Sequence, residues 1–208
     1  MDKSSNILNL IKEMFPNASC ELNYNNHYEL LIAVSLSAQT TDKRVNLVTK
    51  VLFEKYPNPI DLSNANYNDV YNIIQSLGLA KSKTSNIIKL SKIIAEEYNS
   101  IIPNTREELQ KLPGVGRKTA NAVLMEGFRI PAIAVDTHVG RVSKRLGLSK
   151  SDDVKVIEKD LMSLYDEKDY YYVHHGLLFF GRYHCTSQNP KCINCKLKQY
   201  CNYILSGK

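Results

Sequence analysis

The chain has 208 residues, 43% of them hydrophobic, and its 27 lysines and arginines against 21 aspartates and glutamates give a net charge of +6. Length and composition allow one globular domain or two small ones and exclude a disordered chain. The basic excess favours a polyanionic partner. No apolar run reaches the roughly 18 residues of a membrane span, and no secretory signal opens the chain. We therefore expect a cytoplasmic monomer without a membrane partner.

Apolar residues recur at helical spacing along most of the chain. The continuous apolar run 28–37 suits a buried helix, or a strand if it is read alone. Thr40 or Thr41 is placed to cap the next helix, whose apolar positions are Val45, Val48, Val51 and Leu52. No convincing pair of alternating strands with a hairpin turn is present. The predicted fold class is therefore all-α.

Further helices are predicted downstream. Residues 67–77 form one that stops at Gly78, and residues 82–98 form the next. Asp152 is placed to cap a later helix. The stretch 70–95 has no acid but contains four lysines, which are Lys81, Lys83, Lys89 and Lys92. Such a run usually forms a solvated helix face, and it gains meaning only beside another element that binds phosphate.

The segment 112–120, LPGVGRKTA, stands between two predicted helices and could be such an element. Gly114 and Gly116 allow positive φ and close backbone approach. The second helix begins near Arg117, and the amides at its start carry the positive end of the helix dipole. With Val115 between the glycines, the segment forms a phosphate cradle that does not read sequence. An ordinary glycine turn between packed helices is the alternative.

Four of the five cysteines crowd the C-terminal end with the spacing C-x6-C-x2-C-x5-C, and they are Cys185, Cys192, Cys195 and Cys201. In an intracellular chain, this density is more typical of a metal site than of disulfides. Four thiolates at this spacing are compatible with zinc and with an iron–sulfur cluster alike. Either group would close a short segment that lacks apolar residues for a core of its own.

Several motifs together resemble those of the DNA glycosylases related to endonuclease III. Besides LPGVGRKTA and the terminal cysteines, these motifs are SLSAQTTDKRVN at 35–46, LGLAKSK at 77–83, FRIPAIAVDTHV at 128–139 and HHGLLFFGRYHC at 174–185. The resemblance implies two helical domains with a cleft between them. One would be a helical barrel over 21–132 with a helix-hairpin-helix at about 105–125. The other would combine 1–20 with 133–208 around a [4Fe–4S] cluster held by the four cysteines.

The resemblance also implies an activity. The chain would be a bifunctional DNA glycosylase and apurinic/apyrimidinic lyase of base excision repair, acting on duplex DNA that contains oxidised pyrimidines or abasic sites. Lys118 would attack the sugar C1′ carbon and form a Schiff base that leads to β-elimination; a helix start beside Arg117 and partial desolvation would favour its free amine. Asp136, at the predicted N-cap of a helix over 137–146, would stabilise oxocarbenium-like charge across the cleft from Lys118.

An enzyme that takes a base out of the duplex must fill the gap that the base leaves. By the same resemblance, Gln39 would be the plug and Leu79 the wedge. His138 and Lys191 are further candidate DNA contacts. Lys191 is the one basic residue of the loop TSQNPK between the first two terminal cysteines.

Two other functions share part of this pattern. A monofunctional mismatch glycosylase for adenine or thymine has the hairpin and the cluster, but such relatives lack the lysine at position 118. The adenine-removing branch also has an acid where this chain has Val34. A non-enzymatic iron–sulfur DNA-binding regulator has no need of Lys118 or Asp136. The presence of both residues favours the bifunctional enzyme.

Overall fold

The computed structural model describes residues 2–205, which form two compact units. One unit is Glu21–Ile130, and the other, here called the terminal unit, combines Met1–Cys20 with Pro131–Lys208. The described residues form helices, turns and extended segments without a strand, so the predicted all-α fold class is confirmed. No helix within 2–205 is long and apolar enough to cross a membrane.

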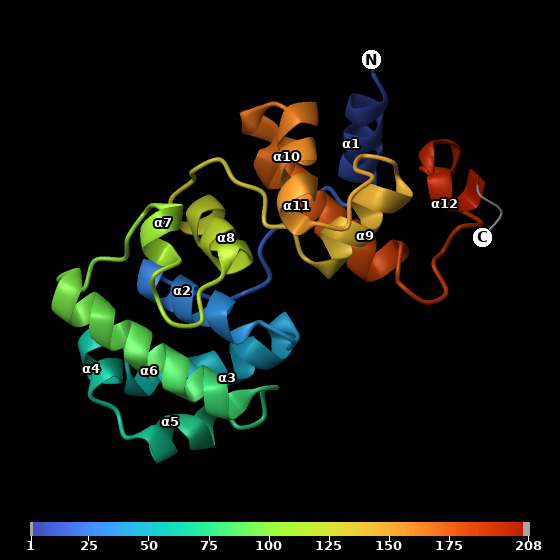
Figure 1. Ribbon diagram of the computed structural model, residues 1–208. Helices are drawn as coiled ribbons and strands as arrows, with labels where there is room; N and C mark the ends of the chain where they lie inside the picture. The colour runs from blue at the N-terminus through green and yellow to red at the C-terminus, as the bar shows by residue number, and fades with distance from the viewer. Residues whose placement is uncertain (1, 206–208) are drawn as a thin grey trace. The chain divides into compact units, whose positions relative to one another are not determined.

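The 21–130 unit is built around one buried helix. Its helices are α2 (His27–Leu36), α3 (Asp42–Lys55), α4 (Pro59–Ser63), α5 (Tyr67–Ile74), α6 (Ala80–Glu97), α7 (Arg106–Leu109) and α8 (Arg117–Gly127) (Figure 1). Nearly every residue of α2 is buried, because α3, α6 and α8 pack around it. A helix enclosed on all sides has no polar face, which explains why its sequence is a continuous apolar run. The predicted helix over 28–37 is confirmed.

The two helices that follow α2 differ in part from their prediction. Thr41 caps α3, with its hydroxyl accepting the N–H of Arg44 at 3.4 Å. Of the four apolar positions named for α3, Val51 is 50% exposed and lies outside the core. The helix predicted over 67–77 ends at Ile74, and Gly78 does not end it. The backbone of another turn passes Gly78 closely instead, and this contact belongs to the candidate site.

The terminal unit joins both ends of the chain. Its helices are α1 (Lys3–Met14), α9 (Thr137–Arg145), α10 (Val154–Leu164), α11 (Tyr170–Phe179) and α12 (Asn202–Leu205) (Figure 1). Gly176 of α11 lets α1 approach so closely that an added Cβ would lie 2.6 Å from Ile11. An ion pair of 3.0 Å between Lys12 and Asp169 joins the same two segments. These contacts explain why the first residues of the chain fold with the last part.

The cap predicted for α10 is one residue off. Asp153, not Asp152, is the N-cap, because its Oδ1 accepts the N–H of Lys155 at 2.7 Å. Asp152 forms an ion pair with Lys144 instead. Adjacent aspartates compete for the same cap, and the sequence pattern alone does not decide between them.

Candidate active site and nucleic-acid interface

The predicted helix-hairpin-helix is present, formed by α7, the turn and α8. Arg106 on α7 donates from Nε to Oδ1 of the buried Asn121 on α8 at 2.8 Å, which ties the two helices together. Val115 at the tip of the turn is buried in the core of the unit, and its N–H donates to the carbonyl of Leu112 at 3.1 Å. The buried Val115 side chain therefore fixes the hairpin to the core, and the hydrogen bond to Leu112 closes the turn. Val115 holds the turn in place and does not expose its side chain.

The two hairpin glycines meet different requirements. Gly114 has φ +78°, and a Cβ there would lie 2.7 Å from Nδ2 and 3.0 Å from Cβ of Asn86 on α6. Gly116 is the N-cap of α8 with φ −87° and ψ 177°, and a Cβ there would meet nothing within 4 Å. The expected left-handed backbone is thus found at Gly114 but not at Gly116. Gly116 instead leaves open space in front of the first amides of α8.

Lys118 is the second residue of α8, and its side chain is exposed. The first backbone hydrogen bond of the helix runs from the N–H of Ala120 to the carbonyl of Gly116 at 2.9 Å, and no side chain caps α8. The amides of residues 117–119 therefore point out of the helix start, where the dipole is positive. The lysine is placed where an anionic backbone would approach. Its exposure differs from the partial desolvation that we expected.

Gln39 and Leu79 lie on two neighbouring turns. Both residues are exposed and both have left-handed backbone, with φ of 54° and 60°. A Cβ added to Gly78 would lie 3.2 Å from the carbonyl oxygen of Gln39, so the two turns touch. Left-handed backbone costs a residue with a side chain about 1–2 kcal/mol, and strain of this kind clusters at functional sites. The structure thus brings together two residues that lie far apart in the sequence.

Lys83 joins these two turns, and the sequence pattern did not predict this role. We expected one of four solvated lysines, yet Lys83 is only 6% exposed. Its Nζ donates to the carbonyl of Ala38 at 2.7 Å and to the hydroxyl of Thr40 at 2.9 Å. Its backbone N–H donates to the carbonyl of Leu79 at 3.0 Å. Burial lowers the pKa of the Lys83 ammonium.

A signal for this burial is present in the sequence. Lys83 precedes Ile87 by four residues and Leu90 by seven, and both of these residues are buried in the core. That spacing places all three side chains on one face of α6. The buried face of the helix therefore contains a charged residue in its first turn.

Asp136 caps α9, as predicted. Its Oδ1 accepts the N–H groups of His138 and Val139, both at 2.9 Å, and its side chain is half-buried. The extended segment before it, residues 132–135, is buried. The carboxylate is therefore held in one orientation by the helix that it begins. Asp136 belongs to the terminal unit and Lys118 to the 21–130 unit.

The four C-terminal cysteines line one pocket. Its walls also include Leu146, Phe180, His184 and Tyr203. Cys185 and Cys201 are buried, Cys192 and Cys195 are half-buried, and none of these thiols forms a disulfide. Within residues 2–205, no three ligating side chains converge on one point as they would around a single ion. The four cysteines instead border the same small pocket.

Two arginines tie α9 to the cysteine segment. Arg145 donates from Nη1 to Sγ of Cys185 at 3.3 Å and to the carbonyl of Thr186 at 2.8 Å. Arg141 donates from Nη2 to the carbonyls of Gly181 at 2.8 Å and of Cys185 at 3.1 Å. Burial raises the pKa of the Cys185 thiol, and the hydrogen bond from Arg145 opposes that rise. The helix that begins at Asp136 and the first cysteine are thus packed together.

The two remaining candidate DNA contacts also lie in the terminal unit. His138 is half-buried, with its Nδ1 at 3.3 Å from Nη2 of Arg141. Gly181 packs against it so tightly that an added Cβ would lie 2.9 Å from Cβ of His138. Lys191 is exposed in the cysteine loop, and its N–H donates to the carbonyl of His184 at 3.1 Å. Lys191 is therefore the more accessible of the two side chains.

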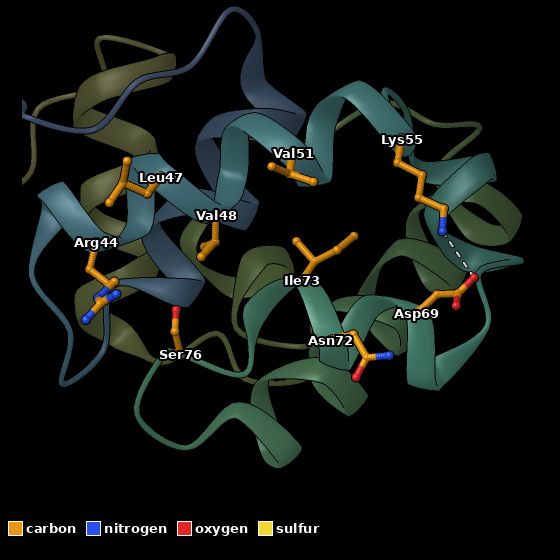
Figure 2. A pocket seen from close by; sticks show the side chains of 9 residues that line it. All are labelled: Arg44, Leu47, Val48, Val51, Lys55, Asp69, Asn72, Ile73 and Ser76. Atoms are coloured by element: carbon orange, nitrogen blue, oxygen red, sulfur yellow. Dashed lines mark hydrogen bonds and ion pairs between the residues drawn. The ribbon is translucent and has the colours of Figure 1, made fainter.

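A groove in the 21–130 unit contains none of the predicted site residues. It lies between α3 and α5, and Figure 2 shows Val51 and Ile73 pointing toward each other across it. An ion pair between Lys55 and Asp69 of 3.1 Å lies at one end. Lys55 and Asp69 are already paired with each other, and none of the residues expected to act in the reaction lines the groove.

Comparisons with known proteins agree with this hairpin and fold. The family described as "HhH-GPD superfamily base excision DNA repair protein" matches residues 32–167. Endonuclease III of Bacillus subtilis (strain 168) is 52% identical over 195 residues, which are 93% of this chain and 89% of that protein. Endonuclease III of Escherichia coli (strain K12) is 39% identical over 97% of this chain and 95% of its own length.

Solved structures give the same result. A trapped endonuclease III–DNA covalent intermediate, an estranged-adenine complex, superposes with a TM-score of 0.94 at 47% identity, covering 100% of this chain and 99% of the other. A thermostable thymine-DNA glycosylase, at 22% identity and a TM-score of 0.88, shares the fold. The chain therefore belongs to the HhH-GPD superfamily and, within it, to the endonuclease III family. The family resemblance inferred from the motifs is confirmed.

Proposed function

We propose that this chain is a bifunctional DNA glycosylase and AP lyase that excises oxidised pyrimidines from duplex DNA in base excision repair. The observation that carries this proposal is the exposed Lys118 at the positive start of α8, directly behind the open hairpin at Gly116. A lyase of this kind needs an accessible amine beside a backbone-binding element, because the amine becomes covalently bonded to the sugar. One structural relative in this family is a trapped covalent DNA intermediate.

In the proposed reaction, Nζ of Lys118 attacks the sugar C1′ and forms a C–N bond while the bond from C1′ to the damaged base breaks. The base leaves with its bonding electron pair and takes up a proton. The sugar ring then opens to the Schiff base, and loss of a C2′ proton expels the 3′ phosphate. The carboxylate of Asp136 stabilises the positive charge that develops at C1′, since α9 holds it in a fixed orientation.

Binding to the duplex uses contacts on both units. The first amides of α8, with Gly114 and Gly116, bind a phosphate without reading the base sequence. Gln39 and Leu79 insert where the damaged base leaves the stack. His138 and Lys191 contribute further contacts from the terminal unit. The protein acts as a monomer in the cytoplasm, on DNA with damaged bases or abasic sites.

The cysteine pocket suits a [4Fe–4S] cluster. Four cysteines line one pocket, and four thiolates from one site are the ligand set that holds such a cluster. Cys185, Cys192, Cys195 and Cys201 would hold it. When bound, the cluster cross-links the C-terminal segment, and its role is structural. Arg145 favours the thiolate form of Cys185 that such ligation needs.

Borohydride trapping on an oligonucleotide duplex with one thymine glycol tests the function. Reduction converts the Schiff base into a stable amine, so the wild type should give a covalent protein–DNA adduct. Lys118→Gln keeps most of the length of the side chain but cannot form an imine, so base release and trapping should both collapse while duplex binding persists. Lys50→Gln, at an exposed lysine of α3, is the matched control and should trap normally.

The outcome also separates the other functions. From a duplex with an adenine or thymine mismatch, a monofunctional mismatch glycosylase would release a base without any trapped adduct. A DNA-binding regulator would bind duplex without release or trapping. If Lys118→Gln still traps efficiently on an abasic site, another amine is the nucleophile and the proposal for Lys118 is wrong.

A further inference from the structure

Lys83 is a buried charge that the proposed reaction does not use. Burying an ammonium is costly unless hydrogen bonds compensate it. Among residues 2–205 no carboxylate pairs with this ammonium, and its hydrogen bonds go to one carbonyl and one hydroxyl. Both partners flank Gln39 directly, at positions 38 and 40. The ammonium therefore binds the residues on both sides of Gln39, whose own backbone is left-handed.

The same lysine also contacts the second turn. Its N–H donates to the carbonyl of Leu79 at 3.0 Å, which is the first backbone hydrogen bond of α6. Leu79 is itself left-handed and 59% exposed. The close approach of Gly78 to the carbonyl of Gln39 leaves no room between the turns. The side chain of Lys83 contacts the Gln39 turn, and its backbone belongs to the helix that Leu79 begins, so one residue joins the two turns.

We infer that Lys83 is a positioning residue that holds the Gln39 turn against the Leu79 turn, so that the two side chains enter the duplex as one rigid unit. This inference rests on the proposed role of Gln39 and Leu79 in DNA. If the turn became ordered only when DNA binds, the entropy cost of ordering it would make insertion less favourable. A turn that is already ordered avoids this cost. An ammonium serves this purpose because it donates to several acceptors at once, and hydrogen bonds from a charged donor are the stronger ones.

The test separates insertion from chemistry. Lys83→Met keeps the buried aliphatic stem and removes the donors. With 2-aminopurine placed next to a thymine glycol in duplex DNA, the fluorescence rise on binding reports unstacking, and single-turnover excision reports the complete reaction. For Lys83→Met we expect both the unstacking rate and excision from duplex to fall about tenfold or more, because the variant loses both charge-assisted hydrogen bonds of the ammonium. Borohydride trapping on a single-stranded abasic oligonucleotide, which needs no insertion, should stay within about twofold of wild type.

A double-mutant cycle gives the decisive readout. If Lys83 acts through the Gln39 turn, the losses from Lys83→Met and Gln39→Ala will not add, because the second change removes an interaction that the first has already abolished. The matched control is Lys89→Met, the same change at an exposed position of α6, whose effect should be small and additive with Gln39→Ala. If Lys83→Met does not fold, Thr40→Val removes one of the two acceptors and should show a smaller loss with the same non-additivity.

Three results would overturn the inference. Additive losses in the cycle would show that Lys83 acts independently of Gln39. An equal loss of single-stranded trapping would show a general structural role. Normal unstacking in Lys83→Met, with Gln39→Ala defective, would show that Gln39 inserts without this support and would leave the proposed function intact. Failure of the proposed function is distinct, since the wild type itself would then give no trapped adduct.

Discussion

The two hairpin glycines allow the phosphate cradle to be separated from the fold. At Gly116 the backbone is extended and a Cβ would meet nothing within 4 Å, so a side chain fits there in the free protein. Threonine is about as good an N-cap residue as glycine. Gly116→Thr should therefore change the free energy of unfolding by less than about 0.5 kcal/mol. The new side chain, however, fills the space in front of the first amides of α8.

The expected decrease in binding follows from that geometry. If a phosphate occupies this space, Gly116→Thr removes charge-assisted hydrogen bonds worth about 1.5–3 kcal/mol, or roughly 10- to 150-fold in affinity. Because these bonds are made to the DNA backbone, the decrease should be the same for undamaged and abasic duplex. Because the backbone amides carry no net charge and the salt dependence arises from phosphates neutralised by lysine and arginine, the slope of log K against log salt should stay nearly unchanged. Fluorescence anisotropy at several salt concentrations measures the affinity for undamaged duplex, the affinity for abasic duplex and the salt slope.

Gly114→Ala is the contrasting variant. Its left-handed φ of +78° costs an alanine about 1–2 kcal/mol. Its Cβ would also overlap Asn86 at 2.7 Å, and overpacking of this kind costs about 1–3 kcal/mol. We expect a decrease of about 2–5 kcal/mol in the free energy of unfolding, measured by urea denaturation. If Gly116→Thr kept its general affinity and lost only lesion discrimination, the phosphate-cradle assignment would be wrong.

Three further predictions concern the terminal unit. Asp136→Asn should slow excision of thymine glycol by about a hundredfold or more, which is the usual loss when a group that stabilises transition-state charge is removed. Cleavage of a pre-formed abasic site should slow less. Equal losses in single-turnover assays would contradict the proposed role of Asp136 in base release. Anaerobically purified protein should contain about four iron atoms and four sulfides per chain. Stoichiometric zinc without iron would refute the cluster. Cys195→Ser, which removes one of the proposed ligands, should lower the folded yield. Asp153→Ala should destabilise the protein by about 1 kcal/mol in urea unfolding through loss of the α10 cap, and Asp152→Ala, its neighbour and control, should cost less.

The sequence predicts features that depend on local chemistry. The apolar run of α2, the cap at Thr41 and the cap at Asp136 follow from side chains and their immediate neighbours. The hairpin at 112–120 is also local, because its turn and both helices lie within a short stretch of chain. The positive φ of Gly114 was predictable for this reason.

Three features that the sequence did not predict depend on distant parts of the chain. Val51 has the apolar character of a core residue, but its position on α3 faces the groove toward Ile73. Gly78 looks like the end of α5. A glycine stands there instead because the carbonyl of Gln39 passes too close for a side chain. Lys83 looks solvated until the partners at positions 38 and 40 are placed beside it. In each case a tertiary contact overrides a local pattern.

The first two turns of α6 explain why the proposed DNA-binding features of the 21–130 unit depend on one another. Leu79 begins the helix, Lys83 holds the Gln39 turn one turn later, and Asn86 packs against Gly114 of the hairpin one turn after that. Each of these contacts reaches a different segment of the chain, so none is visible as a motif. Because the same rigid helix carries all three, a change that tilts its start should disturb insertion and phosphate binding together, whereas a change in Lys83 alone should disturb only insertion. The separate roles of Lys83 and Gly116 can thus be measured in one protein.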